Sequence, residues 1–160
     1  MAQVTTKDFS TLPVGRLGLI PLQSCSSLGA KVNDWLVKWR AERQYPGMDS
    51  FAFEGYKRDS YIIDAKTPRF GSGEGKCTIN ESVRGDDIYV MVDVTNYSLS
   101  YPIGPYTNLM SPDDHFQDMK RVIAADPDIL PNTSRSPCLC IYYDYASDKG
   151  GLKHEILHSL

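Results

Sequence analysis

The chain lacks an apolar run of the roughly 18 residues needed to cross a bilayer, and it lacks an excess of positive charge. Its 17 lysines and arginines face 20 aspartates and glutamates, which gives a net charge of −3 over 160 residues. The first ten residues, "MAQVTTKDFS", also lack the apolar region of a signal peptide. We therefore expect a cytoplasmic protein with neither a membrane nor a nucleic acid as its partner.

Cysteine is scarce and is not arranged for metal or redox chemistry. The four cysteines are Cys25, Cys77, Cys138 and Cys140, and no pair has the Cys-x-x-Cys spacing. That spacing is typical of zinc knuckles and of thioredoxin-like redox pairs, so neither is indicated. Cys138 and Cys140 would share one face of a strand, and we expect the cysteines to be structural.

Strand-like and helix-like segments alternate along the chain. An apolar run at residues 17–23 predicts a first strand, and residues 27–43 predict an amphipathic helix. Five apolar residues at helical spacing are expected to face the core: Leu28, Val32, Trp35, Leu36 and Trp39. Residues 60–64 and 76–80 predict two strands on either side of a glycine-rich turn.

The second half continues this alternation. "DDIYVMVDV" (residues 86–94) is too apolar to leave one face in water, which is typical of a buried parallel strand. Residues 95–110 are expected to form a long loop. A helix then starts with Ser111 as N-cap and Pro112 at its first position. Its buried face is expected to carry Phe116, Met119 and Ile123. With "CLCIYYDYA" as a last strand, the order predicts an α/β domain.

One stretch resembles a known family. "INESVRGDD" (residues 79–87), followed by an apolar strand, resembles a hallmark of the N-terminal half of ribose-phosphate pyrophosphokinases. "FGSGE" (residues 70–74) is similar to that family's Phe-Ser-Asp-Gly-Glu turn, and the resemblance covers roughly residues 17–125. It implies a type I phosphoribosyltransferase-like α/β fold for an N-terminal domain of residues 1–125, with a mainly parallel sheet flanked by helices.

The resemblance also implies a function in nucleotide biosynthesis. Members of the family are homo-oligomeric kinases that transfer the diphosphoryl group of ATP to ribose 5-phosphate, with magnesium as cofactor. The resemblance implies that Phe70, Ser72 and Glu74 bind ATP. Ser72 stands where the family has aspartate, which weakens the contact expected there.

The same resemblance implies a second, regulatory site. Ser82 and Arg84 match positions of a regulatory phosphate site. An arginine fork beside a serine hydroxyl suits phosphate oxygens. The plainer interpretations are that Phe70 is a core residue beside a turn, that Glu74 is a solvated charge, and that Arg84 belongs to a surface ion network.

Residues 126–160 depart from the family. Ser147 and Asp148 stand where an Arg-Gln pair is expected, and no glycine-rich phosphate loop is present. We therefore assign no catalytic residue and expect the chain alone to be inactive, or to act as a non-catalytic regulatory or assembly module. A shifted reading frame is a further alternative, since codons for "TSRSPC" could in another frame specify Ile-Thr-Val-Thr-Met-Pro.

The C-terminal sequence "HEILH" offers an unrelated interpretation. In a terminal helix, His154 and His158 would share one face and could bind zinc, with Glu155 as general base of a metallopeptidase. A third ligand is missing from the motif. The competing expectation is a short amphipathic helix that follows the strand of the tail and buries its apolar side chains.

Overall fold

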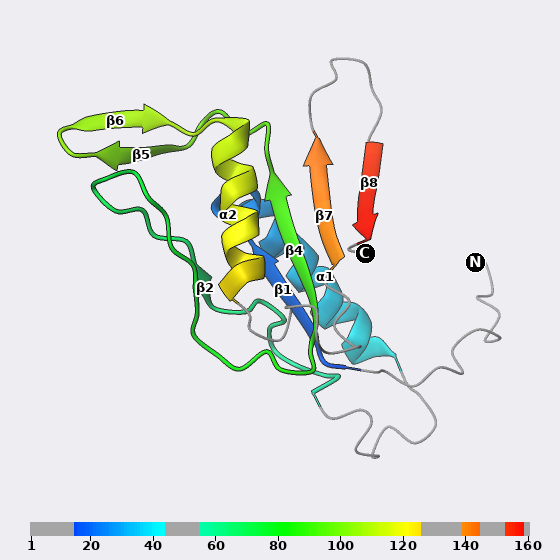
Figure 1. The fold of residues 1–160 in the computed structure, drawn as a ribbon. Coiled ribbons are helices and arrows are strands. Elements are labelled where there is room, and N and C mark those ends of the chain that lie inside the picture. Colours follow the sequence, from blue (N-terminus) through cyan, green and yellow to red (C-terminus); the bar gives the residue numbers. More distant parts are fainter. Residues whose placement is uncertain (1–14, 44–54, 126–138, 145–152, 159–160) are drawn as a thin grey trace.

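The computed structural model describes residues 15–43, 55–125, 139–144 and 153–158, and they form a mixed α/β fold around a small, mainly parallel sheet (Figure 1). The strand order of this sheet is β1-β4-β7-β8. Pairing is parallel from β1 through β4 to β7 and antiparallel between β7 and β8. The elements are β1 (Leu17–Pro21), the 3-10 helix η1 (Gln23–Cys25), α1 (Ser26–Glu42), β2 (Ala65–Lys66), β3 (Thr78–Ile79), β4 (Asp87–Asp93), β5 (Ser100–Ile103), β6 (Tyr106–Leu109), α2 (Pro112–Ala125), β7 (Leu139–Asp144) and β8 (Lys153–His158).

The central strand β4 is buried, as its sequence predicts. Val90 and Val92 are 0% exposed and share a hydrophobic cluster with Val122 of α2. Successive strand residues point to opposite faces, so this face of the sheet is covered by α2. On the other face Met91 is buried, and α1 covers that side (Figure 1). The predicted parallel strand between two helices is confirmed.

Helix α1 forms where its pattern predicts, but the expected buried face holds only in part: Leu28, Val32 and Leu36 are half-buried, and the two tryptophans are exposed. Trp35 and Trp39 are 53% and 49% exposed, whereas Gly29 and Asn33 are buried. The added Cβ of an alanine at position 29 would lie 2.3 Å from Pro21 Cβ, so the missing side chain lets the helix approach β1 closely. Asn33 Oδ1 accepts a hydrogen bond from the Tyr61 backbone N–H at 2.8 Å. The close approach at Gly29 and the hydrogen bond of Asn33 therefore contribute to the orientation of this helix.

The segment between α1 and β4 forms less regular strand than expected. Within residues 60–64 there is a single parallel bridge, in which Ile62 pairs with Leu19 of β1. The Leu19 N–H donates to the Tyr61 carbonyl at 2.7 Å, and the Ile63 N–H donates to the Leu19 carbonyl at 2.8 Å. Residues 61–63 therefore extend the sheet on the free side of β1. The expected strand at 76–80 is reduced to β3, which pairs with β2.

The expected loop at residues 95–110 is instead a β-hairpin, and that prediction is wrong. Strands β5 and β6 pair antiparallel, with Ile103 opposite Tyr106. Gly104 has a φ of +55° and is followed by Pro105, which suits the two-residue turn that needs glycine at its first central position. All four residues of β6 are exposed.

The predicted start of α2 is confirmed. The predicted buried face of this helix is confirmed only in part. Met119 is buried, while Phe116 and Ile123 are half-buried and pack against the core. His115 and Asp118 are also buried, which apolar spacing did not predict. No helix of the described residues is long and apolar enough to span a membrane.

The tail is a pair of strands. The predicted strand in "CLCIYYDYA" is confirmed as β7. The expected terminal helix is wrong, because residues 153–158 form β8 and pair antiparallel with β7. Ser147 and Asp148 lie outside the described residues.

Candidate functional site

The turn that resembles the family's nucleotide-binding turn is the tip of a long, irregular hairpin. Its base is closed by a hydrogen bond from the Asn80 N–H to the Asp64 carbonyl at 2.9 Å. Pairing between β2 and β3 and an antiparallel bridge between Arg69 and Gly75 continue the hairpin toward residues 70–74. We refer to residues 70–74 as the tip.

Backbone hydrogen bonds define the conformation of the tip. The Phe70 N–H donates to the Glu74 carbonyl at 2.7 Å, and the Gly73 N–H donates to the Phe70 carbonyl at 2.9 Å. Gly73 has a φ of +88°, which side chains disfavour. The Gly104 N–H at the turn of the β5–β6 hairpin donates to the Gly71 carbonyl at 3.1 Å. The two hairpins therefore support each other.

The side chains implied in ATP binding lie on the outside of the tip. Phe70 is 50% exposed, and Ser72 and Glu74 are exposed. Phe70 is therefore not the core residue of the plainer interpretation. An aromatic ring of this kind offers a flat apolar surface, and a neighbouring carboxylate accepts hydrogen bonds from amino groups.

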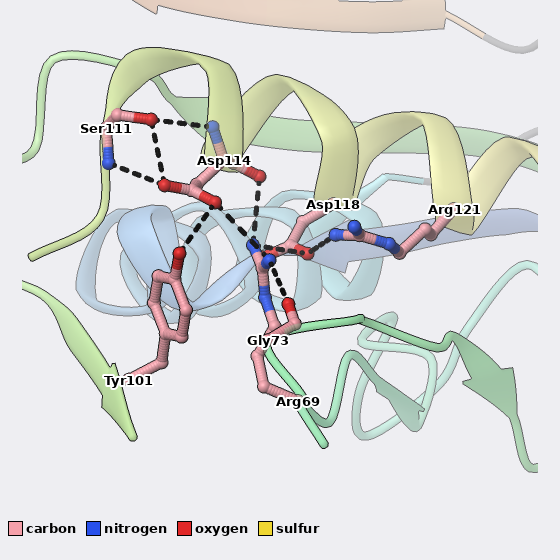
Figure 2. Close-up of polar contacts among 7 residues, drawn as sticks. All are labelled: Arg69, Gly73, Tyr101, Ser111, Asp114, Asp118 and Arg121. Atoms are coloured by element: carbon pink, nitrogen blue, oxygen red, sulfur yellow. Dashed lines mark hydrogen bonds and ion pairs between the residues drawn. The ribbon is translucent and has the colours of Figure 1, made fainter. Parts of the chain in front are cut away.

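Arg69 fixes the tip to α2 and to β5 (Figure 2). Its Nη1 lies 3.3 Å from Asp114 Oδ1 and donates to the Gly73 carbonyl at 3.4 Å. Its Nη2 donates to the Asp114 carbonyl at 3.3 Å and lies 3.2 Å from Asp118 Oδ1. The guanidinium also stacks on the Tyr101 ring, 4.7 Å from its centroid. The Arg69 side chain is only 9% exposed.

A second arginine completes this network. Arg121 Nη1 bonds the same Asp118 oxygen that Arg69 contacts. The Arg121 guanidinium packs across Gly75, where an added Cβ would lie 2.6 Å from Arg121 Cζ. Two guanidinium groups thus share one carboxylate that is 9% exposed. Two arginines and two aspartates therefore lie beneath the tip, and their formal charges sum to zero.

Asp114 joins this network to the start of α2. Its Oδ2 accepts hydrogen bonds from the Ser111 N–H at 2.9 Å and from the Ser111 hydroxyl at 2.8 Å, while the Asp114 N–H donates to Ser111 Oγ at 3.2 Å. The Tyr101 hydroxyl donates to Asp114 Oδ1 at 3.3 Å. This reciprocal cap satisfies free N–H groups at the helix start.

The surroundings of Asp114 shift the pKa of its carboxyl group in opposite directions. Burial raises this pKa, but hydrogen bonds from Ser111, the charge of Arg69 and the Tyr101 hydroxyl lower it, and the net result lies below the ordinary value of 3.8. A lowered pKa in the folded state stabilises the protein above the unfolded-state pKa, and this stabilisation is lost as the pH falls through the folded-state pKa.

We expect Asp114→Asn to lower the free energy of unfolding by about 1.5–3 kcal/mol near neutral pH, the usual range for hydrogen bonds to a charged group. The difference from the wild type should begin to shrink as the pH falls below about 4, where the unfolded-state carboxyl takes up its proton, and it is lost as the pH falls through the lower folded-state pKa. Urea unfolding at a series of pH values measures this. The raised pKa of Asp87, caused by burial and then by Asp86, contributes equally to both proteins. A difference that stays constant with pH would contradict the assignment.

The expected regulatory residues lie at the other end of the same hairpin. Ser82 and Arg84 are exposed and follow its base, in the turn that leads into β4. Gly85 has a φ of +77° in this turn, and buried Asp86 bonds Arg16 Nε at 2.9 Å. The tip and the Ser82–Arg84 segment are therefore two separate places, and the structure does not bring their side chains together.

A polar cluster at the carboxyl ends of β1 and β4 was missed by the sequence analysis. The Asp93 N–H bonds Ser24 Oγ at 3.0 Å, and Asp93 Oδ1 accepts from the Thr95 hydroxyl at 2.8 Å. Buried His115 Nε2 donates to the Asn96 carbonyl at 2.8 Å. The sequence gives little signal for the contacts of Ser24, because they join it to Asp93 and Asn96, some 70 residues away.

The two described cysteine side chains have no reactive character. Burial, and then the Asp93 carboxylate, raises the pKa of Cys25 to about 12. Burial, and then Asp118, also raises the pKa of Cys77. Because the thiolate is the nucleophile, both thiols stay protonated and inert near neutral pH.

The zinc-site hypothesis requires a helix at the C-terminus, and residues 153–158 form a strand instead. His154 and His158 lie on β8, where four residues span about 13 Å, against about 6 Å along a helix. Among the residues whose side chains are described, no three His, Cys, Asp or Glu form a group that could hold a metal ion.

Comparison with known proteins gives no further assignment: no family model, curated protein or solved structure matches the chain.

Proposed function

We propose that residues 1–125 are the N-terminal domain of a ribose-phosphate pyrophosphokinase-type protein with a type I phosphoribosyltransferase-like fold. In this proposal the ligand is magnesium-ATP, and the tip binds its adenine. The observation that carries this proposal is the half-exposed Phe70 ring, held beside Glu74 by the hydrogen bond between their backbones. Phe70 would stack on the base, and Glu74 would accept a hydrogen bond from the adenine amino group.

In this proposal the chain binds ligands and does not itself catalyse diphosphoryl transfer to ribose 5-phosphate. The tip supplies an aromatic face and a carboxylate, and the two arginines beneath it, Arg69 and Arg121, are committed to Asp114 and Asp118. Ser82 and Arg84 would bind a regulatory phosphate from their exposed turn. No catalytic residue is assigned.

Phe70→Ala is expected to weaken ATP binding about tenfold or more, because stacking of a base on an aromatic ring contributes about 1–3 kcal/mol. Calorimetric titration of the full chain with magnesium-ATP measures this. Tyr97→Ala is the matched control, since Tyr97 is an exposed aromatic residue outside the tip, 63% exposed against 50% for Phe70. Binding that is equal in both variants would exclude the tip as the adenine site, and a wild-type chain without ATP binding would reject the proposal.

A second function, that of a non-catalytic assembly module, is favoured by the β5–β6 hairpin. Tyr106 is 73% exposed and Leu109 is 71% exposed, both on β6. A two-stranded hairpin is marginally stable on its own, and its apolar residues would be better buried against another copy of the chain.

Light scattering separates the module from a simple nucleotide-binding domain. We expect the mass of the wild-type particle to increase when phosphate or ADP is added, and Leu109→Lys to reduce that mass toward the monomer. A monomer that is indifferent to both ligands would argue against the assembly module.

A further inference from the structure

We propose that Arg69 is a positioning residue that holds the tip in its binding conformation by joining it to α2 and to the β5–β6 hairpin. The part of this inference that concerns ATP rests on the function proposed above. The part that concerns the shape of the tip rests on the contacts of Arg69 alone.

One side chain reaches all three elements. Arg69 precedes Phe70, and its guanidinium donates back to the Gly73 carbonyl within the tip at 3.4 Å. The same group reaches Asp114 at 3.3 Å in the first turn of α2 and stacks on Tyr101 of β5. A planar fork of five N–H donors can serve these directions together, whereas a lysine ammonium is a compact point charge that cannot.

The burial of Arg69 shows which contacts orient it. Its side chain is 9% exposed, and its Nε is buried without a hydrogen-bond partner among the described residues. A buried donor left unsatisfied is costly. The guanidinium is therefore oriented by the contacts of its two Nη atoms, which are those that join the tip to α2.

The tip has little other support. Its internal bonds are two backbone hydrogen bonds, and its described bond to the β5–β6 hairpin is the one between Gly104 and Gly71. Phe70, Ser72 and Glu74 are exposed, and Ile103 of the β5–β6 hairpin lies next to Gly73. Without Arg69, we expect the tip to exchange among conformations, so that a ligand must pay the cost of ordering it.

The test measures tip order and ATP binding in the same variants. Arg69→Lys keeps the charge that Asp114 and Asp118 require, and Arg69→Met removes it. The control is Arg16→Met, which breaks the ion pair of a more exposed arginine, 46% against 9%, with buried Asp86, and none of the described contacts joins Arg16 to the tip. Order is measured as the ¹⁵N order parameters of residues 70–75, with β4 as internal reference, and binding by calorimetry with magnesium-ATP.

For Arg69→Lys we expect tip order parameters to fall from about 0.85 to below about 0.6, with β4 unchanged and ATP binding about tenfold weaker. Arg16→Met should keep both tip order and ATP affinity. Unchanged tip order in Arg69→Lys, or an equal loss of order in β4, would overturn the positioning role. If the wild type binds no ATP, the proposed function fails, while the order parameters still decide the role of Arg69.

Discussion

Asp118→Ala is expected to lower the free energy of unfolding by about 3–5 kcal/mol, the usual cost of removing one partner from a buried ion pair. The Asp118 side chain is 9% exposed and contacts two arginines, with Arg69 Nη2 at 3.2 Å. Its removal leaves both guanidinium groups in a site that water reaches poorly. Urea unfolding followed by circular dichroism measures the change.

The control for this variant is Asp113→Ala, which removes an exposed carboxylate five residues earlier in the same helix. We expect it to change stability by no more than about 0.5 kcal/mol. The double variant Arg69→Met/Asp118→Leu should recover part of the loss, because an apolar pair replaces two buried charges. If Asp118→Ala costs no more than Asp113→Ala, the network behaves as a surface ion cluster and contributes little.

The elements predicted correctly have strong local signals. The apolar strand β4 and the start of α2 at Ser111 and Pro112 could be read from adjacent residues. These signals lie within a few neighbouring residues, and they do not depend on which other elements pack against the strand or helix. The same holds for β7, whose short run of apolar and aromatic residues favours a strand.

The errors arise where packing overrides the local pattern. In α1 the fully buried residues are Gly29 and Asn33, which an apolar pattern does not count. In the tail, the six residues "KHEILH" are compatible with the periodicity of a helix and with that of a strand. Pairing with β7 makes them a strand. A short apolar run cannot be assigned from periodicity alone.

The motif in the sequence located the candidate site, but it did not indicate the residues that hold the tip in place. Residues 70–74 were identified from the resemblance, whereas the arginine that anchors them bonds Asp114, 45 residues along the chain. Nothing in the local sequence marks Tyr101 or Asp118 as partners of Arg69. The network exists only because the two hairpins and α2 meet.

Tyr61 joins the segment before the tip to the rest of the fold. It is 1% exposed, and its hydroxyl donates to the Tyr56 carbonyl at 2.6 Å. Arg40 of α1 stacks on the ring, 5.0 Å from its centroid. The backbone of Tyr61 bonds Asn33 of α1 and Leu19 of β1. One residue thus links the helix, the sheet edge and the chain that leads to the tip.

Tyr61→Ala is expected to cost about 3–5 kcal/mol of unfolding free energy, because it leaves a cavity the size of an aromatic ring between α1 and the sheet. Tyr61→Phe is the matched control, and it should cost about 1–2 kcal/mol because it removes the hydroxyl and leaves the Tyr56 carbonyl without that donor. Urea unfolding of both variants separates the contribution of the ring from that of the hydrogen bond. Equal losses in the two would mean that the hydroxyl, and not the packing of the ring, holds this segment against the sheet. A larger loss in Tyr61→Ala would show that burial of the ring contributes more to stability than the hydrogen bond of the hydroxyl.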